Sequence, residues 1–307
     1  MGRNFLDIND LSGDDLRQIL AAAGRMKQEW KSGNRERQRS VLANKTLAMI
    51  FEQPSTRTRV SFDVAMTHLG GHALVLSSDQ LQLGRGETIA DTARVMSRFV
   101  DCIMLRTGEH AHLVELANHA SVPVINGLTN LTHPCQVMAD VMTFEDHVGP
   151  IGGRTVAWIG DGNNMVRSWL HAAARLGFVL RMCCPDGYQP DGQTVAWARQ
   201  QGADVRVCAS ISEAVSGADC VTTDTWVSMS DRDADQRRAL FADYCVDAAV
   251  MAKAAPHAIF MHCLPAHRGE EVTDEVMDGP QSVVFDEAEN RLHVQKAILA
   301  WCMQAAG

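Results

Sequence analysis

The chain has 307 residues and a formal charge of −9, and 46% of its residues are hydrophobic and 21% charged. This balance is typical of a soluble globular protein of two domains and argues against a nucleic-acid surface, which usually needs a basic stripe. No stretch approaches the roughly 18 apolar residues of a membrane helix, and residues 1–7 lack the apolar core of a signal peptide. Nine cysteines without a Cys-x-x-Cys pair favour a reducing compartment, so we expect a cytoplasmic protein.

Strand-like and helix-like segments alternate through the first half of the chain. An N-terminal helix should end near Gly33, and the short connections that follow predict a parallel sheet with helices on its faces. Ligands of such sheets bind beyond the carboxyl ends of the strands. The expected strands are 46–51, 73–77, 101–106 and 122–126, and the expected helices are 56–69, 87–99 and 109–119.

A long helix over 133–148 leads to two glycine-rich turns and then to a second α/β series. We therefore expect two domains, 1–148 and 149–289, each built as a parallel sheet flanked by helices. In the second domain the expected strands are 155–159, 179–184, 204–208, 220–223, 258–262 and 282–285, with helices at 164–176 and 193–201.

Two further segments have distinct patterns. Residues 226–246 are polar and charged around a helix-like middle at 233–243, which favours a mobile surface segment. The last pattern, 290–303, is a helix with apolar positions. It should let the C-terminal segment 290–307 pack back on the first domain.

Residues 51–59, Phe-Glu-Gln-Pro-Ser-Thr-Arg-Thr-Arg, join a buried strand to a helix. Ser55 falls at the helix N-cap, where backbone N–H groups and the helix dipole favour an anion. Arg57 adds a planar guanidinium that suits phosphate. The alternative is a capped helix with a solvated basic face, so these residues alone do not identify a phosphate site.

Other polar residues should meet this segment at the same sheet edge. Arg106 and Asn126 end strands, while His133 and Gln136 lie one helical turn apart and share a face. Singly, Arg106 could form an ordinary ion pair, and the histidine and glutamine could be a cap and a surface residue. Their convergence with Arg57 favours an anion site.

In the second half, residues 160–164, Gly-Asp-Gly-Asn-Asn, follow a strand and open a helix, the position of a dinucleotide-binding turn. Met165 replaces the third glycine of that fingerprint, which makes NAD binding a minor alternative. The amide side chains at this helix N-terminus could instead hydrogen-bond a small carboxylate.

Two further strands end in reactive groups. Asp224 ends one of them, and its carboxylate is a natural partner for an ammonium group. Cys263 ends the other and is either a buried small residue or part of the site. Its neighbour His262 should point to the opposite face, which argues against covalent catalysis by a Cys-His pair. Leu264-Pro265 is a candidate cis bond that sequence cannot assign.

Together these stretches resemble the ornithine carbamoyltransferases over almost the whole chain. The motifs resembling the family are Ser-Thr-Arg-Thr-Arg at 55–59, Leu-Gly-Arg-Gly-Glu at 83–87, Asp-Thr-Ala-Arg at 91–94, His-Pro-Cys-Gln at 133–136, Asp-Gly-Asn-Asn at 161–164, the run 224–229, and His-Cys-Leu-Pro at 262–265. The Ser-Thr-Arg-Thr-Arg and His-Pro-Cys-Gln motifs are shared with aspartate carbamoyltransferases. Residues 224–229 and Cys263-Leu264 resemble the ornithine branch, which decides the expected substrate.

The resemblance implies a homotrimer that binds carbamoyl phosphate and L-ornithine. It implies that carbamoyl phosphate is bound by Ser55, Thr56, Arg57, Thr58, Arg106, His133 and Gln136, with Arg291 on the same side and Gln82 reaching in from a neighbouring subunit. It implies that ornithine's α-amino and α-carboxylate groups are held by Asn164, Asp224, Ser228 and Met229, with Cys263 and Leu264 bordering the reacting amine. Ser230 departs from the family, which usually has glycine there.

The implied reaction transfers a carbamoyl group to the δ-amine of ornithine, giving citrulline and phosphate in arginine biosynthesis or degradation. We expect Arg57, Thr58, Arg106, His133 and Cys263 to take part in it, without a metal or another cofactor. The competing hypotheses are a carbamoyltransferase for aspartate or an acylated ornithine, a non-catalytic binding homologue, and a nucleotide-dependent oxidoreductase.

Overall fold

The computed structural model describes residues 2–77, 86–227 and 234–303, which fold into two compact units. Unit 1 comprises Met1–Ala139 and Glu289–Gly307, and unit 2 comprises Asp140–Ala288. Both sheets are parallel, which confirms the expected α/β class with one parallel sheet in each unit. None of the described helices combines the length and apolar character of a membrane span.

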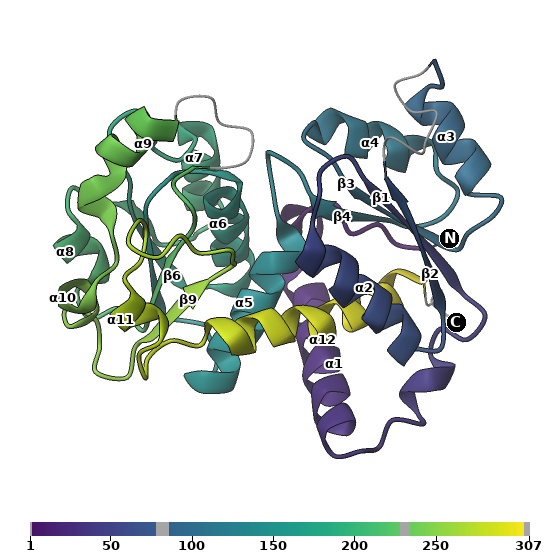
Figure 1. Ribbon diagram of the computed structural model, residues 1–307, viewed down its shortest axis with the longest axis horizontal. Helices are drawn as coiled ribbons and strands as arrows, with labels where there is room; N and C mark the ends of the chain where they lie inside the picture. Colours follow the sequence, from purple (N-terminus) through teal and green to yellow (C-terminus); the bar gives the residue numbers. More distant parts are fainter. Residues whose placement is uncertain (1, 78–85, 228–233, 304–307) are drawn as a thin grey trace. The chain divides into compact units, whose positions relative to one another are not determined.

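Unit 1 is built around a four-stranded sheet in the order β2-β1-β3-β4. Ala48, Ile50, Ile103 and Leu105 point to one face, where they pack with apolar residues of α3 and α4. Figure 1 shows α1, α2 and α12 on the other side of this sheet. The elements are η1 (Ile8–Asp10), α1 (Gly13–Lys31), η2 (Gln38–Ser40), β1 (Thr46–Phe51), α2 (Thr56–His68), β2 (His72–Ser77), α3 (Ile89–Met96), β3 (Cys102–Arg106), α4 (His110–His119), β4 (Val124–Leu128) and α5 (Pro134–His147), which ends in unit 2.

Unit 2 is built around a five-stranded sheet in the order β7-β6-β5-β8-β9. Ala157, Ile159, Val221 and Phe260 line the face that packs against α8, α10 and α11, and α6 and α7 cover the other (Figure 1). The elements are β5 (Thr155–Ile159), α6 (Asn164–Leu176), β6 (Val179–Cys183), α7 (Gly192–Gln200), β7 (Val205–Val207), α8 (Ile211–Val215), β8 (Cys220–Thr223), α9 (Ala234–Phe241), η4 (Ala242–Tyr244), α10 (Ala248–Met251), β9 (Ile259–His262), α11 (Asp274–Met277) and α12 (Val284–Met303), most of which belongs to unit 1.

Two expectations from the sequence are wrong in detail. The segment 282–285 is not a strand: Ser282 forms a single bridge with Phe260, and α12 already begins at Val284. Phe285, the last residue of the expected strand, is 67% exposed. Asn126 lies inside β4 and not at its end, because the strand continues to Leu128. Its amide donates hydrogen bonds to the carbonyl of Leu6 and the hydroxyl of Thr132, so it has a structural role.

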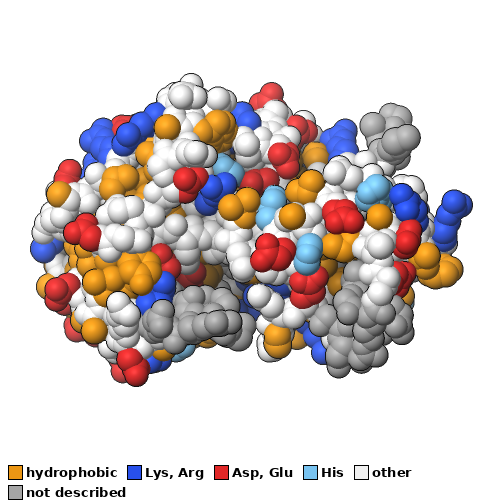
Figure 2. All heavy atoms as spheres, turned by 90° about the horizontal axis from the view of Figure 1, so that it is seen from above, with side chains coloured by type: hydrophobic (Ala, Val, Ile, Leu, Met, Phe, Trp, Pro, Cys, Tyr) orange, Lys and Arg blue, Asp and Glu red, His pale blue; other side chains and the backbone are white. Residues whose placement is uncertain are grey.

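The state of the cysteines and the distribution of surface charge are as the amino-acid composition leads us to expect. All nine cysteines are free thiols. On the face drawn in Figure 2, acidic and basic side chains are interspersed, as expected for a chain with opposite charges spread along its sequence.

Candidate active site

Arg106 and Thr58 meet at the carboxyl edge of the unit 1 sheet. Arg106 ends β3 directly beside Phe51, the last residue of β1, and Ser55 is the N-cap of the helix that follows β1. The short segment between β1 and α2 thus brings the start of α2 close to Arg106. The Arg106 guanidinium lies 3.5 Å from the hydroxyl oxygen of Thr58, which is buried in the first turn of α2.

A third segment reaches the same hydroxyl from the far end of the chain. Arg291 of α12 donates a hydrogen bond of 2.9 Å to Thr58 and a second one to the side-chain oxygen of Gln136 on α5. All three side chains are buried. The sequence placed Arg291 on this side only through the family resemblance, and the structure brings it into direct contact with two of the other predicted residues.

His133 precedes α5 and is surrounded by positive charge. Burial, together with the guanidinium groups of Arg291, Arg106 and Arg57, holds the pKa of His133 well below its ordinary value of 6.5. The imidazole is therefore neutral near pH 7 and can donate one N–H hydrogen bond without adding charge. Three guanidinium groups around a neutral imidazole can together bind an anion with several oxygens.

The start of α2 remains open to solvent on one side. Thr56 and Arg57 are exposed, and the Ser55 side chain makes no capping hydrogen bond to its own helix. The positive end of a 13-residue helix and an exposed guanidinium therefore lie next to the buried cluster. Gln82, which the sequence assigned to the same ligand, lies outside the described residues.

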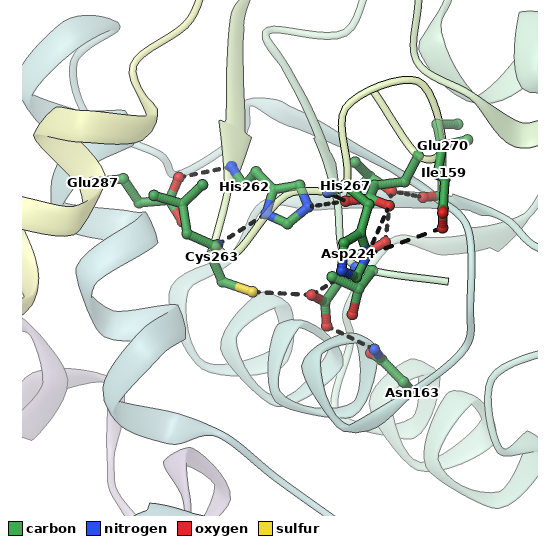
Figure 3. Close-up of polar contacts among 12 residues, drawn as sticks. Ile159, Asn163, Asp224, His262, Cys263, His267, Glu270 and Glu287 are labelled. Atoms are coloured by element: carbon green, nitrogen blue, oxygen red, sulfur yellow. Dashed lines mark hydrogen bonds and ion pairs between the residues drawn. The ribbon is translucent and has the colours of Figure 1, made fainter. Parts of the chain in front are cut away.

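Asp224 is the centre of the second predicted group, in unit 2 (Figure 3). One carboxylate oxygen accepts a hydrogen bond of 2.9 Å from the Asn163 amide. The other oxygen accepts from the Cys263 thiol, with a sulfur–oxygen distance of 3.1 Å, and from the backbone N–H of Thr225. The ends of β8 and β9 and the start of α6 thus converge on one carboxylate.

Cys263 is a thiol in this arrangement. Burial and the negative charges of Asp224 and Glu287 raise its pKa well above the usual value. A protonated thiol is a poor nucleophile, because the thiolate is the reactive form. The structure therefore agrees with the sequence argument against covalent catalysis at this residue.

The His262 ring points away from Cys263 and fixes the turn after it (Figure 3). Its Nδ1 accepts a hydrogen bond of 2.9 Å from the backbone N–H of Leu264, and its Nε2 lies 3.2 Å from a carboxylate oxygen of Glu271. These contacts place the ring proton on Nε2, as a donor to Glu271. The peptide bond between Leu264 and Pro265 in this turn is cis.

Asn164 opens α6, as expected, and Asn163 beside it makes two side-chain contacts. The Asn163 side chain caps the helix by accepting from the Met165 N–H, and it also donates to Asp224. Gly162, just before it, lies so close to the 189–190 backbone that a Cβ there would be 2.4 Å from the Pro190 nitrogen. The close approach explains the glycine without a dinucleotide.

Sequence reasoning missed several residues that hold this site. Arg237 of α9 lies 2.5 Å from Asp161 and donates to the carbonyl of Trp226, which ties α9 to two of the site turns. Glu287 accepts from the His262 backbone N–H over 2.8 Å. No local sequence pattern predicts these contacts, because the two residues of each contact lie 11 to 76 positions apart in the chain. Ser228, Met229 and Ser230 lie outside the described residues.

Among the described residues, two groups have the composition of metal ligands. In the first, Asp224, His262 and Cys263, both ring nitrogens and the thiol already make the hydrogen bonds described above. Binding an ion there would require these contacts to break. The second group is His267, Glu270 and Glu271, on the turn that follows Pro265.

Comparison with known proteins gives matches over nearly the whole chain. Residues 3–146 match the family model described as aspartate/ornithine carbamoyltransferase, carbamoyl-P binding domain, and residues 152–302 match the model for the Asp/Orn binding domain. The ornithine carbamoyltransferase of Rhizobium johnstonii is 58% identical over 303 residues, 99% of each chain. That of Nitrobacter winogradskyi is 60% identical over 305 residues, 99% of this chain and 98% of that protein.

Solved structures give the same result for the fold. Ornithine carbamoyltransferase from Pyrococcus furiosus matches with a TM-score of 0.95 and 48% identity, covering 100% of this chain and 98% of that one. The enzyme from Burkholderia thailandensis matches with a TM-score of 0.90 and 48% identity, over 98% and 99% of the two chains.

Proposed function

The chain belongs to the aspartate/ornithine carbamoyltransferase family, and we propose that it transfers the carbamoyl group of carbamoyl phosphate to the δ-amine of L-ornithine, giving L-citrulline and phosphate. The observation that carries this proposal is the buried contact of Arg291 with Thr58 and Gln136, beside Arg106 and the neutral His133. The guanidinium groups of Arg291 and Arg106 give this cluster a net positive charge, as binding of a doubly charged acyl phosphate requires.

In this proposal, unit 1 binds carbamoyl phosphate. Ser55, Thr56 and Arg57 at the start of α2 hold the phosphate, and Thr58, Arg106 and His133 donate to the carbonyl oxygen. Negative charge develops on that oxygen when the amine attacks, and donors already in place stabilise it without reorganising. Arg291 of α12 holds Thr58 in position and also donates to Gln136 of α5.

Unit 2 binds ornithine in this proposal. Asp224 attracts the α-ammonium group, and Asn164, Ser228 and Met229 complete the contacts to the α-amino and α-carboxylate groups. Cys263 and Leu264 border the δ-amine, which must lose a proton before it attacks because an ammonium group has no lone pair. The new N–C bond forms as the C–O bond to phosphate breaks, and the departing phosphate takes up the remaining amine proton.

The domain roles, assembly and compartment complete the proposal. Residues 1–148 with 290–307 form the carbamoyl phosphate domain, and 149–289 form the ornithine domain. The chain acts as a homotrimer in which Gln82 enters a neighbouring subunit's site, and light scattering of the purified protein tests this. The compartment is the cytoplasm, which is supported by nine free thiols.

The reaction is tested by measuring phosphate release from carbamoyl phosphate with ornithine, acetylornithine, putrescine or aspartate as the acceptor. We expect ornithine to be preferred, and a preference for aspartate would refute the proposal. Arg57→Gly and Arg106→Gly should each lower turnover about a hundredfold or more, because losing one donor to the charge that develops on the leaving phosphate or on the carbonyl oxygen costs roughly 3 kcal/mol. The exposed Arg98, replaced by glycine, is the control and should keep its activity.

A further inference from the structure

The turn that follows Pro265 carries three possible metal ligands on five consecutive residues. Hydrogen bonds from the N–H of Gly269 to the carbonyl of Val272 and from the N–H of Glu270 to the carbonyl of His267, both 2.9 Å, close the turn. Gly269 has a φ of +85°, which favours glycine. The backbone that presents the three side chains is therefore well defined.

Glu271 is the buried member, with 0% of its surface exposed. Its Oε1 accepts hydrogen bonds from His262 at 3.2 Å and from the backbone N–H of His267 at 2.5 Å. Its Oε2 is also buried but has no hydrogen-bond donor among the described residues. A buried carboxylate oxygen without a partner is unfavourable, because it has lost its water and gained nothing in return.

Glu270 presents a second oxygen of the same kind. Its Oε1 accepts from Arg238 at 3.0 Å, whereas its buried Oε2 has no donor in the described part of the chain. The Nδ1 atom of His267 lies 4.0 Å from this oxygen and 3.8 Å from Oε2 of Glu271, too far for hydrogen bonds. Arg268 does not compensate them, since its guanidinium binds Asp274 and Asp278.

We propose that His267 Nδ1, Glu270 Oε2 and Glu271 Oε2 bind a divalent transition-metal cation of the Zn²⁺ type. Each of the three residues offers a ligand atom within 4.8 Å of the others. In a tetrahedral zinc site, with metal–ligand distances of about 2.1 Å, the ligand atoms are roughly 3.4 Å apart. His267 is 45% exposed on its side chain, so the ring can move the short distance required. A water molecule completes the coordination.

The proposed site differs from the other candidate group in one decisive respect. Asp224, His262 and Cys263 already use their ligand atoms in hydrogen bonds, whereas the two carboxylate oxygens here have no donors among the described residues. The site is also connected to the turn at Leu264. The Oε1 atom of Glu271 holds His262, which holds the backbone N–H of Leu264, so a metal on Oε2 fixes a carboxylate that orders this turn.

The test is equilibrium dialysis of the full-length protein against Zn²⁺, followed by metal analysis. We expect one zinc ion per chain in the wild type and its loss in His267→Ala, a half-exposed position where the substitution should not disturb folding. His257→Ala is the matched control, because His257 is also a half-exposed histidine beside a carboxylate, at 2.9 Å from Asp219. This variant should retain the zinc.

A second variant separates the two candidate groups. Cys263→Ser should keep the zinc and, with Co²⁺ as the probe, should show the absorption of a nitrogen and oxygen site without a thiolate band. Zinc retained by His267→Ala, or lost from Cys263→Ser, would place the ion elsewhere and overturn the proposal. Absence of zinc from the wild type would overturn it too.

Discussion

Arg291 donates a hydrogen bond of 2.9 Å to the hydroxyl of Thr58, although 233 positions separate the two residues in the chain. The contact joins α12 to the first turn of α2, and the second bond from Arg291 joins α12 to Gln136 of α5. The last helix is therefore part of the architecture of the proposed phosphate site, and not only a support for unit 1.

Arg291→Gln should lower kcat/KM for carbamoyl phosphate by at least tenfold, because Thr58 and Gln136 lose a charged donor that positions them. The free energy of unfolding should fall by about 1 to 3 kcal/mol, since buried acceptors lose their partner. Steady-state kinetics and urea unfolding measure the two effects.

The control for this variant is Lys31→Gln. Lys31 also joins α12 to another helix, through Glu289 at 3.0 Å, but its side chain is 54% exposed. An exposed ion pair contributes little, so both kinetics and stability should stay close to the wild type. Equal kinetics for Arg291→Gln and the wild type would contradict a positioning role for Arg291.

The sequence predicted best those elements whose boundaries have local causes. The strand 46–51 is a short apolar run, and the helix 164–176 has a capping asparagine before it and a left-handed glycine after it, so both were predicted with their observed bounds. The segment 282–285 was misread because valine and phenylalanine favour strands. Only Ser282 pairs with β9, and the helix begins before Phe285.

In the candidate site, too, the residues with local sequence signals could be predicted and those held by distant contacts could not. Residues at strand ends, such as Arg106 and Asp224, could be predicted because parallel strands share a functional edge. The link from Glu271 through His262 to Leu264 could not, since it depends on how a later turn folds back onto β9. Asn126 shows the opposite error, because an error of two residues in a strand end placed a buried structural amide at the expected functional edge of the sheet.

Gly162→Ala should disturb the turn that opens α6. A Cβ at this position would be 2.4 Å from the Pro190 nitrogen, and backbone cannot move away as a side chain can. We expect a loss of about 1 to 3 kcal/mol in stability and a raised KM for ornithine, because Asn163 next to it holds Asp224. Gly192→Ala is the matched control, with no atom within 4 Å of its Cβ. Similar stability of the two variants would argue against the close approach.

Acid should destabilise the protein through its buried histidines. Burial lowers the pKa of His293 to about 4, aided by the charge of Lys296, and the pKa of His133 is lowered too. Between about pH 6.5 and pH 4 the unfolded chain therefore binds more protons than the folded chain. The free energy of unfolding must fall as the pH is lowered through this window.

Urea unfolding as a function of pH measures this loss. In His293→Gln the decline between about pH 6.5 and pH 4 should be shallower than in the wild type, whereas His72→Gln, at an exposed position, should not change it. An unchanged decline in His293→Gln would show that other groups cause the acid sensitivity.

Lys296 should make stability rise at alkaline pH. Its ammonium group is completely buried, 2.9 Å from the side-chain oxygen of Gln38 and 5.3 Å from the centre of the Trp30 ring. Burial lowers its pKa from 10.5 to about 8. Between these two values the unfolded chain keeps a proton that the folded chain has lost, so the free energy of unfolding increases with pH, by at most about 1.4 kcal/mol per pH unit. In urea unfolding as a function of pH, Lys296→Met should remove this increase, whereas Lys253→Met, at an exposed position, should retain it. A wild-type free energy of unfolding that falls steadily from pH 8 to pH 10 would mean that Lys296 stays charged in the folded protein.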